Sequence, residues 1–242
     1  MIRAERHGAV AVATIDRPER RNALNTSMVE ELSEVLGAAV SAGARALVLT
    51  GAGGHFCAGA DLTGVEDDRF RMALGTLLRA LGAAPLVAIA AVEGAALGAG
   101  SQLAVACDLR VATPDARFGI PAAKLGLMVD QWTVRRLTRM AGEGTARAML
   151  LAAEEVDGTA ALRLGLVQRA GGLEEALAWA ETIAGLAPLT VAGHKLALER
   201  QDQEGAPDEA VDAAVRRAWS SDDLAEGMAA FRERRRPEFR GR

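Results

Sequence analysis

Residues 86–107, LVAIAAVEGAALGAGSQLAVAC, decide which fold class this sequence can adopt. Residues 86–92 form a continuous apolar run, which is typical of a strand buried on both faces in a parallel sheet. Residues 94–100 follow as a turn of glycine, alanine and leucine, and residues 101–107 are predicted to form a helix. The stretch therefore predicts one β-turn-α unit of an α/β protein.

A second unit of the same kind occupies residues 46–62. Its apolar run, Ala46-Leu47-Val48-Leu49, ends in a glycine-rich loop that continues into Phe56-Cys57-Ala58-Gly59-Ala60-Asp61-Leu62. Open α/β folds place their ligand crevice at the carboxyl ends of the strands, where both loops would lie. N–H groups near residues 98–100 begin a helix and suit a partly negative oxygen. If the first loop brings another N–H opposite, the two form an oxyanion hole.

Other interpretations of these glycines are a nucleotide site or a plain connection. Residues 51–56 have Phe56 where a GxGxxG motif needs its last glycine, and no GxxxxGK[ST] motif occurs in the sequence. A nucleotide fingerprint is therefore not predicted. Glycine-rich turns after strands are also often only tight connections, and each turn taken alone fits that explanation.

The rest of the chain fits one core with a helical extension. Residues 10–15 are predicted as a strand, and a helix is predicted to open with the capping-box pattern Ser27-Met28-Val29-Glu30. Another strand is expected around residues 109–112, and from Gln131 onward the pattern is almost wholly helical. Its expected interruptions are Gly158, Gly172 and Pro188. We expect residues 1–190 to form the core and residues 191–242 a helical C-terminal region.

Composition excludes several classes of protein. The 242 residues are 50% hydrophobic and 25% charged with a formal net charge of −4, which disfavours both disorder and nucleic-acid binding. The N-terminus lacks an apolar signal core, and no uncharged stretch approaches the ~18–20 residues of a membrane span, so we expect a cytoplasmic protein. Cys57 and Cys107 form no CxxC pattern, and no histidine lies at metal-ligand spacing, so neither a disulfide framework nor a metal site is predicted.

Three motifs follow one another in a fixed order: residues 56–62, the turn at residues 94–100, and Cys107-Asp108-Leu109-Arg110. Together they resemble the crotonase superfamily of enoyl-CoA hydratases and isomerases. Arg17-Pro18 and Asn22-Ala23-Leu24-Asn25 are similar to the family's CoA-binding segment, and residues 226–237 to its C-terminal helix. The resemblance implies an α/β fold built as a ββα spiral with a helical C-terminal trimerisation region. It also implies acyl-CoA as ligand, with no cofactor besides the coenzyme A of the ligand itself.

Carried across residue by residue, the resemblance makes Ala60 and Ala99 the two oxyanion N–H donors. It also implies a set of residues around the CoA and beside the pocket: Arg21, Ala23, Leu24, Ala58 and Asp61. Phe231 and Arg234 match positions that reach the CoA of a neighbouring subunit, which implies a homotrimer or hexamer. A helix packing residue and a solvated cation are the alternative interpretation of this last pair.

The catalytic acids of the family's hydratases are absent. These enzymes use two glutamates to move protons, and the two positions are occupied here by Gln102 and Ala122. Neither side chain exchanges a proton near neutral pH. Loss of one general acid or base typically removes about 10²–10⁴ in rate, so hydration should be weak or lost. His55, on the loop before Ala60, is expected to be solvent-exposed.

Asp130 is the one acid left in a suggestive position. It is similar in position to a carboxylate that serves other members of the superfamily, so an isomerase or hydrolase that relies on Asp130 is the alternative function. Asp before Gln131 is equally a common helix cap. Residues 125–132, together with Gln102, resemble actinobacterial members that bind acyl-CoA without hydrating it and are linked to mycolic-acid synthesis. Acyl-CoA binding in fatty-acid metabolism is therefore the leading hypothesis, and a scaffold without ligand is the third.

Overall fold

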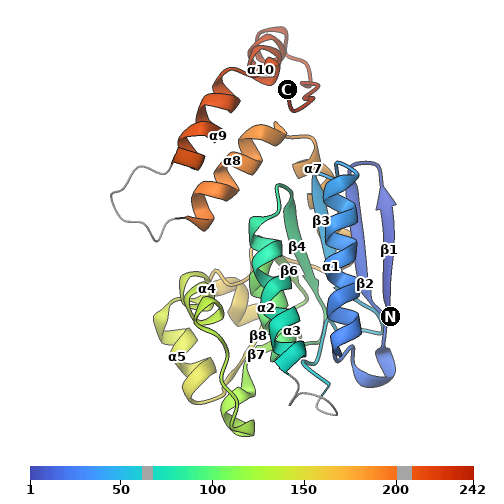
Figure 1. Ribbon diagram of the computed structural model, residues 1–242, viewed down its shortest axis with the longest axis vertical. Helices are drawn as coiled ribbons and strands as arrows, with labels where there is room; N and C mark the ends of the chain where they lie inside the picture. Colours follow the sequence, from blue (N-terminus) through green and yellow to red (C-terminus); the bar gives the residue numbers. More distant parts are fainter. Residues whose placement is uncertain (62–67, 201–208) are drawn as a thin grey trace.

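Strands and helices alternate along the computed structural model, which describes residues 1–61, 68–200 and 209–242 (Figure 1). The strands are β1 (Ile2–His7), β2 (Val10–Ile15), β3 (Ala46–Gly51), β4 (Val87–Val92), β5 (Ala95–Leu97), β6 (Leu109–Ala112), β7 (Arg117–Gly119), β8 (Glu155–Asp157) and β9 (Arg169–Ala170). The helices are η1 (Pro18–Arg20), α1 (Thr26–Ser41), α2 (Asp68–Ala83), α3 (Ala99–Ala106), η2 (Pro121–Leu125), α4 (Gln131–Ala141), α5 (Glu143–Leu151), α6 (Gly158–Arg163), α7 (Leu173–Ala184), α8 (Pro188–Glu199), α9 (Glu209–Trp219) and α10 (Asp222–Glu233). The predicted α/β fold class is confirmed.

The main sheet has six strands in the order β1-β2-β3-β4-β6-β9. β1 and β2 are antiparallel, and each later pair is parallel. Parallel neighbours need crossover connections, which α1, α2 and α3 provide. The strands predicted at residues 10–15 and 109–112 are β2 and β6. α3 begins at Ala99, two residues before the predicted start.

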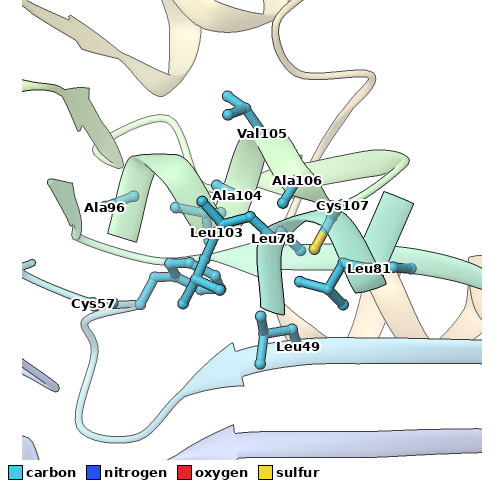
Figure 2. Packing of buried hydrophobic residues seen from close by; sticks show 14 of the residues in the cluster. Leu49, Cys57, Leu78, Leu81, Ala96, Leu103, Ala104, Val105, Ala106 and Cys107 are labelled. Atoms are coloured by element: carbon cyan, nitrogen blue, oxygen red, sulfur yellow. The ribbon is translucent and has the colours of Figure 1, made fainter. Parts of the chain in front are cut away.

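Side chains of the central strands alternate between two apolar cores. In β3, Leu47 and Leu49 join the larger core with α1, α2 and α3, whereas Val48 packs against α7 in the smaller core. Figure 2 shows Leu49, Leu78 of α2 and Leu103 of α3 gathered in the larger core. Because helices cover both faces of the sheet, β4 is apolar throughout, and β3 is apolar from Ala46 to Leu49.

A second sheet, β5-β7-β8, holds the glycine-rich turn that follows β4. β5 pairs with β7 in parallel, and β7 pairs with β8 antiparallel. The N–H of Gly98 donates to the carbonyl of Gly119, the last residue of β7, at 2.8 Å. The turn that opens α3 is therefore fixed by a strand that comes after α3 in the sequence.

The helices α8, α9 and α10 lie at one end of the molecule (Figure 1). α8 is anchored to the core by Lys195, whose ammonium donates to the carbonyls of Leu81 and Leu86 at 2.8 Å each and pairs with Asp108 at 2.7 Å. The expected boundary between residues 190 and 191 falls inside α8. The division into a core and an oligomerisation region stays a prediction.

The start of α1 differs from the capping-box prediction. The side chain of Asn25 accepts the N–H of Met28 at 3.0 Å, so the helix begins at Thr26. Ser27 instead donates to Glu31 at 3.0 Å. The predicted capping box was wrong because Asn25, not Ser27, is the N-cap. Asn25 has an extended backbone, and its side-chain oxygen accepts a free N–H of the first turn. Ser27 already lies inside the helix.

The region after Gln131 contains two short strands, β8 (Glu155–Asp157) and β9 (Arg169–Ala170), where an almost wholly helical pattern was predicted. β8 pairs with β7 and β9 with β6, both far away in sequence. Strands of two or three residues are too short to show an alternating pattern, so no local signal predicts them. The three residues expected to interrupt the helical pattern all lie at the start of a helix. Gly158 is the first residue of α6, Gly172 precedes α7, and Pro188 is the first residue of α8.

Within the described ranges, no single helix is long and apolar enough to cross a membrane. α7 and α8 have the length and the apolar composition of a membrane-spanning helix only when they are taken together, and the two helices meet at a bend of 111°. The inner face of α7 is already buried in the smaller core through Ala176, Ala180 and Ile183.

Candidate active site

The loop that carries Ala60 is held by Leu24. The N–H of Leu24 donates to the carbonyl of Gly59 at 2.8 Å, and the N–H of Asp61 donates to the carbonyl of Leu24 at 2.7 Å. These two bonds bracket Ala60 in a parallel bridge, so the N–H of Ala60 points to the opposite side, away from Leu24.

The turn that carries Ala99 depends on two glycines. Gly98 has φ 52° and ψ −117°, a conformation that favours glycine. A Cβ on Gly100 would lie 2.1 Å from the carbonyl oxygen of Cys57, so only glycine lets the two loops approach this closely. Ala99 is the first residue of α3, where an N–H has no partner inside the helix and lies at the positive end of the helix dipole.

The two turns lie side by side. Cys57 donates its N–H to Ala95 at 2.8 Å and accepts the N–H of Leu97 at 2.9 Å. A Cβ on Gly59 would be 3.9 Å from the nitrogen of Ala99, so the residue before Ala60 abuts the start of α3. No hydrogen bond from the N–H of Ala60 or of Ala99 to another group is found in residues 1–61, 68–200 and 209–242. Two available N–H donors therefore come together at this point.

The residues expected around CoA form the rim of the Ala60 loop. The carbonyl of Arg21 accepts the N–H of Ala58 at 2.9 Å, and the carbonyl of Ala23 accepts from Arg17 at 3.2 Å. Leu24 is fully buried, and the carboxylate of Asp61 pairs with Arg17 at 2.7 Å. The structure thus brings five predicted residues together beside Ala60: Arg21, Ala23, Leu24, Ala58 and Asp61.

Asn22 is a positioning residue that the sequence did not single out. Its side chain is fully buried, accepts the N–H of Arg17 at 2.9 Å and donates to the carbonyls of Ala52 and His55. Its φ of 61° lies in the left-handed region, which asparagine tolerates better than most residues. Asn22 thereby joins residues 17–22 to the loop after β3.

His55 is half-buried, not solvent-exposed as expected. Its Nδ1 accepts the N–H of Ala95 at 3.2 Å, and a Cβ on Gly94 would lie 2.5 Å from the same atom. The expectation failed because β5 packs on this loop, a contact between segments 40 residues apart.

The positions of the missing acids lie close to α3. Gln102 is half-buried on α3, and its side-chain oxygen accepts the hydroxyl of Thr133 at 3.2 Å. Ala122 is half-buried in η2, three residues after the Gly119 that accepts the N–H of Gly98. Neither position supplies a group that could transfer a proton.

Asp130 caps α4, as one of its two interpretations predicted. Its Oδ1 accepts the N–H of Thr133 at 3.0 Å, and its Oδ2 lies 3.4 Å from a guanidinium nitrogen of Arg79. Both carboxylate oxygens are thus occupied by structural contacts. A role for Asp130 as acid, base or nucleophile stays a prediction.

The buried thiols are poor candidates for nucleophiles. Burial raises the pKa of Cys57 and of Cys107 to about 12, so both remain protonated near neutral pH. In the part of the chain that the structure describes, no group of three or more His, Cys, Asp or Glu residues could hold a metal ion.

The two residues expected to reach a neighbouring subunit lie elsewhere. Arg234 is exposed with φ 53°, directly after α10, and α10 is far from the start of α3 in Figure 1. The side chain of Phe231 lies outside the described residues. Within one chain, Arg234 is therefore not brought to the Ala60 and Ala99 turns.

The fold and the paired turns agree with the comparisons to known proteins: the chain belongs to the enoyl-CoA hydratase/isomerase family, whose model matches residues 5–242. One relative is "Probable enoyl-CoA hydratase echA6" of Mycobacterium tuberculosis, which is 47% identical in sequence. The match covers 96% of this chain and 97% of that protein. "Short-chain-enoyl-CoA hydratase" of Clostridium acetobutylicum is 35% identical, with 97% of this chain matching 95% of its length. The resemblance to the crotonase superfamily is confirmed.

Solved structures confirm the crotonase fold. An enoyl-CoA hydratase/carnithine racemase from Magnetospirillum magneticum matches all of this chain and 96% of its own, with a TM-score of 0.91 and 32% sequence identity. An enoyl-CoA hydratase from Bacillus anthracis matches all of this chain and 99% of its own, with a TM-score of 0.89 and 28% identity.

Proposed function

We propose that this protein binds acyl-CoA thioesters and holds the thioester carbonyl between the N–H groups of Ala60 and Ala99. The observation that carries the proposal is the close approach of two main-chain donors that have no acceptor in the described chain, one of them at the positive end of α3. Donors arranged in this way stabilise negative charge on a carbonyl oxygen. Membership of the enoyl-CoA hydratase/isomerase family supports coenzyme A as the group to which the acyl chain of the ligand is attached.

We further propose that the protein hydrates 2-enoyl-CoA weakly or not at all and acts in fatty-acid metabolism in the cytoplasm. Gln102 and Ala122 offer no proton relay, which supports the first part. A place near mycolic-acid synthesis is supported only by the resemblance of residues 125–132, together with Gln102, to actinobacterial members of the family. The alternative, an isomerase or hydrolase driven by Asp130, gains no support from a carboxylate that already caps α4 and faces Arg79.

We expect the chain to form a trimer or hexamer in solution. α9 and α10 expose large apolar side chains that a subunit contact would cover: Val215, Trp219, Leu224 and Met228. Exposed apolar residues gathered on one region favour association. Light scattering at micromolar concentration should give three or six times the mass of one chain. A single-chain mass would contradict this expectation.

Ala99→Pro tests the proposed carbonyl site. Proline lacks the N–H but is tolerated at the first position of a helix, where Ala99 lies. Total affinity is a poor measure, because the nucleotide and pantetheine contribute most of the binding. The preference for butyryl-CoA over a thioether analogue without the carbonyl isolates the contribution of the carbonyl. One neutral hydrogen bond contributes about 0.5–1.5 kcal/mol, so the preference should fall about two- to tenfold.

The matched control is Gln131→Pro, which places proline at the same position of α4. It should leave the thioester preference unchanged. Thermal melting of both variants checks that the turns remain folded, because a proline restricts the residue before it. An unchanged preference in a folded Ala99→Pro variant would mean that this N–H does not hold the carbonyl.

A further inference from the structure

The peptide between Gly59 and Ala60 carries one of the two proposed carbonyl donors. Because this peptide is planar and trans, the carbonyl of Gly59 points opposite to the N–H of Ala60. Any group that holds the Gly59 carbonyl therefore also orients the Ala60 N–H. Gly59 supplies little restraint of its own, since its φ is 118° and glycine has the widest backbone freedom of all residues. Neighbouring groups must fix the plane of this peptide.

The thiol of Cys57 is one of these groups. It donates to the carbonyl oxygen of Gly59, which lies 3.6 Å from its Sγ, and it accepts the N–H of Gly59 at 3.4 Å. The N–H of Leu24 donates to the same carbonyl at 2.8 Å. A carbonyl oxygen has two lone pairs, and here both have a donor. The peptide is thus held from the side opposite to the N–H of Ala60.

Burial keeps the Cys57 thiol able to make both bonds. The side chain is fully buried, and burial raises the pKa of the thiol to about 12, so the S–H proton is retained near neutral pH. Gly59 is buried as well, and among the described residues the sulfur of Cys57 is the only acceptor found for its N–H. Removal of the thiol would leave this N–H without an acceptor and the Gly59 carbonyl with one donor fewer.

We propose that Cys57 is a positioning residue for the thioester carbonyl: its thiol holds the carbonyl of Gly59 and so orients the N–H of Ala60 toward the ligand. The inference rests on the proposed function, because it needs a ligand carbonyl at Ala60. Such a carbonyl completes a chain of hydrogen bonds that runs from the thiol through one peptide to the ligand. Each bond in a chain polarises the next, so the bound carbonyl should strengthen the bond from the thiol to Gly59. A cysteine that only fills the core would not respond to the carbonyl.

Infrared spectroscopy of the S–H stretch tests this coupling without a change at Cys57. The chain has two thiols, Cys57 and Cys107, so Cys107→Ala leaves one band and assigns it. Butyryl-CoA should shift the Cys57 band to lower frequency, because a stronger hydrogen bond weakens the S–H bond. The thioether analogue, which has no carbonyl, should leave the band in place, and neither ligand carries a thiol of its own. A Cys57 band that responds equally to both ligands would overturn the inference.

Binding measurements give a second test. The preference for butyryl-CoA over the thioether analogue should fall about two- to fivefold in Cys57→Ala. This is less than the loss of a full hydrogen bond, because the Ala60 N–H is still present and only its alignment is lost. Cys57→Ser should keep more of the preference than Cys57→Ala, since a hydroxyl also donates and accepts.

The matched control is Cys107→Ala, at the end of α3 remote from Ala99. Cys107 is as fully buried as Cys57, and both belong to the larger core of Figure 2, so each substitution removes one buried sulfur atom. Cys107→Ala should lower stability and keep the preference of the wild type. An unchanged preference in a folded Cys57→Ala variant would overturn the inference and leave the proposed function standing. Equal binding of both ligands by the wild type would overturn the proposed function itself. The infrared measurement decides the question even where Cys57→Ala does not fold.

Discussion

Crotonyl-CoA should be hydrated at least about 10⁴-fold more slowly by this protein than by the short-chain-enoyl-CoA hydratase of Clostridium acetobutylicum measured beside it. Each missing acid removes about 10²–10⁴ in rate, and both positions, Gln102 and Ala122, lack one. The loss of absorbance of the conjugated thioester measures the reaction directly. Turnover within tenfold of the reference enzyme at neutral pH would refute the expectation.

Restoring both acids provides the complementary experiment. Gln102→Glu with Ala122→Glu should raise the hydration rate above that of the unchanged protein, since the Ala99 turn and η2 are linked through Gly98 and Gly119. Gln102→Glu alone should give less, because a single carboxylate would have to act both as the base toward water and as the acid toward the α-carbon. Circular dichroism shows whether the double variant has kept its fold.

Lys195→Met should lower the free energy of unfolding by about 3–5 kcal/mol, the usual result of removing one partner of a buried ion pair. Lys195 and Asp108 are only 7% and 17% exposed, and the ammonium also satisfies the carbonyls of Leu81 and Leu86. Denaturant unfolding measures the loss. Lys124→Met, at the exposed other lysine, is the control and should change stability by less than about 0.5 kcal/mol.

The pH dependence of this loss follows from Asp108. Burial raises the pKa of this carboxyl above its ordinary value of 3.8, while the Lys195 ammonium lowers it. Without Lys195 the folded variant binds a proton at Asp108 more readily than the unfolded chain does. The difference in free energy of unfolding between the wild type and Lys195→Met should therefore become smaller as the pH falls toward 5 and larger as it rises toward 8. Asp108→Asn in the Lys195→Met background should recover part of the loss at pH 8.

Features determined by neighbouring residues could be predicted from the sequence. The apolar runs of β3 and β4 and the glycines before α3 depend on local composition, and the structure contains the strands and the turn they predict. The helical periodicity of α1 was also visible, but its first residue was not, because Asn25 and Ser27 are both acceptable caps and only the backbone distinguishes them.

Features that join distant segments could not be predicted. Asn22 bonds to carbonyls 30 and 33 residues away, and His55 accepts an N–H 40 residues away. No periodicity within one segment reports such contacts. The same holds for Thr133, which lies 31 residues from the Gln102 that it orients. These long-range hydrogen bonds align the two turns and the side chain beside them.

The proposed carbonyl donors at residues 60 and 99 belong to the main chain, which every amino acid except proline supplies. Substitution at either position thus leaves the donor in place as long as the glycines keep the shape of the turns. Proton transfer, in contrast, depends on one side chain at each of two positions and disappears with a single replacement. Thioester binding should for this reason tolerate substitutions better than proton transfer does. A member of such a family can lose the hydration reaction and still bind the thioester.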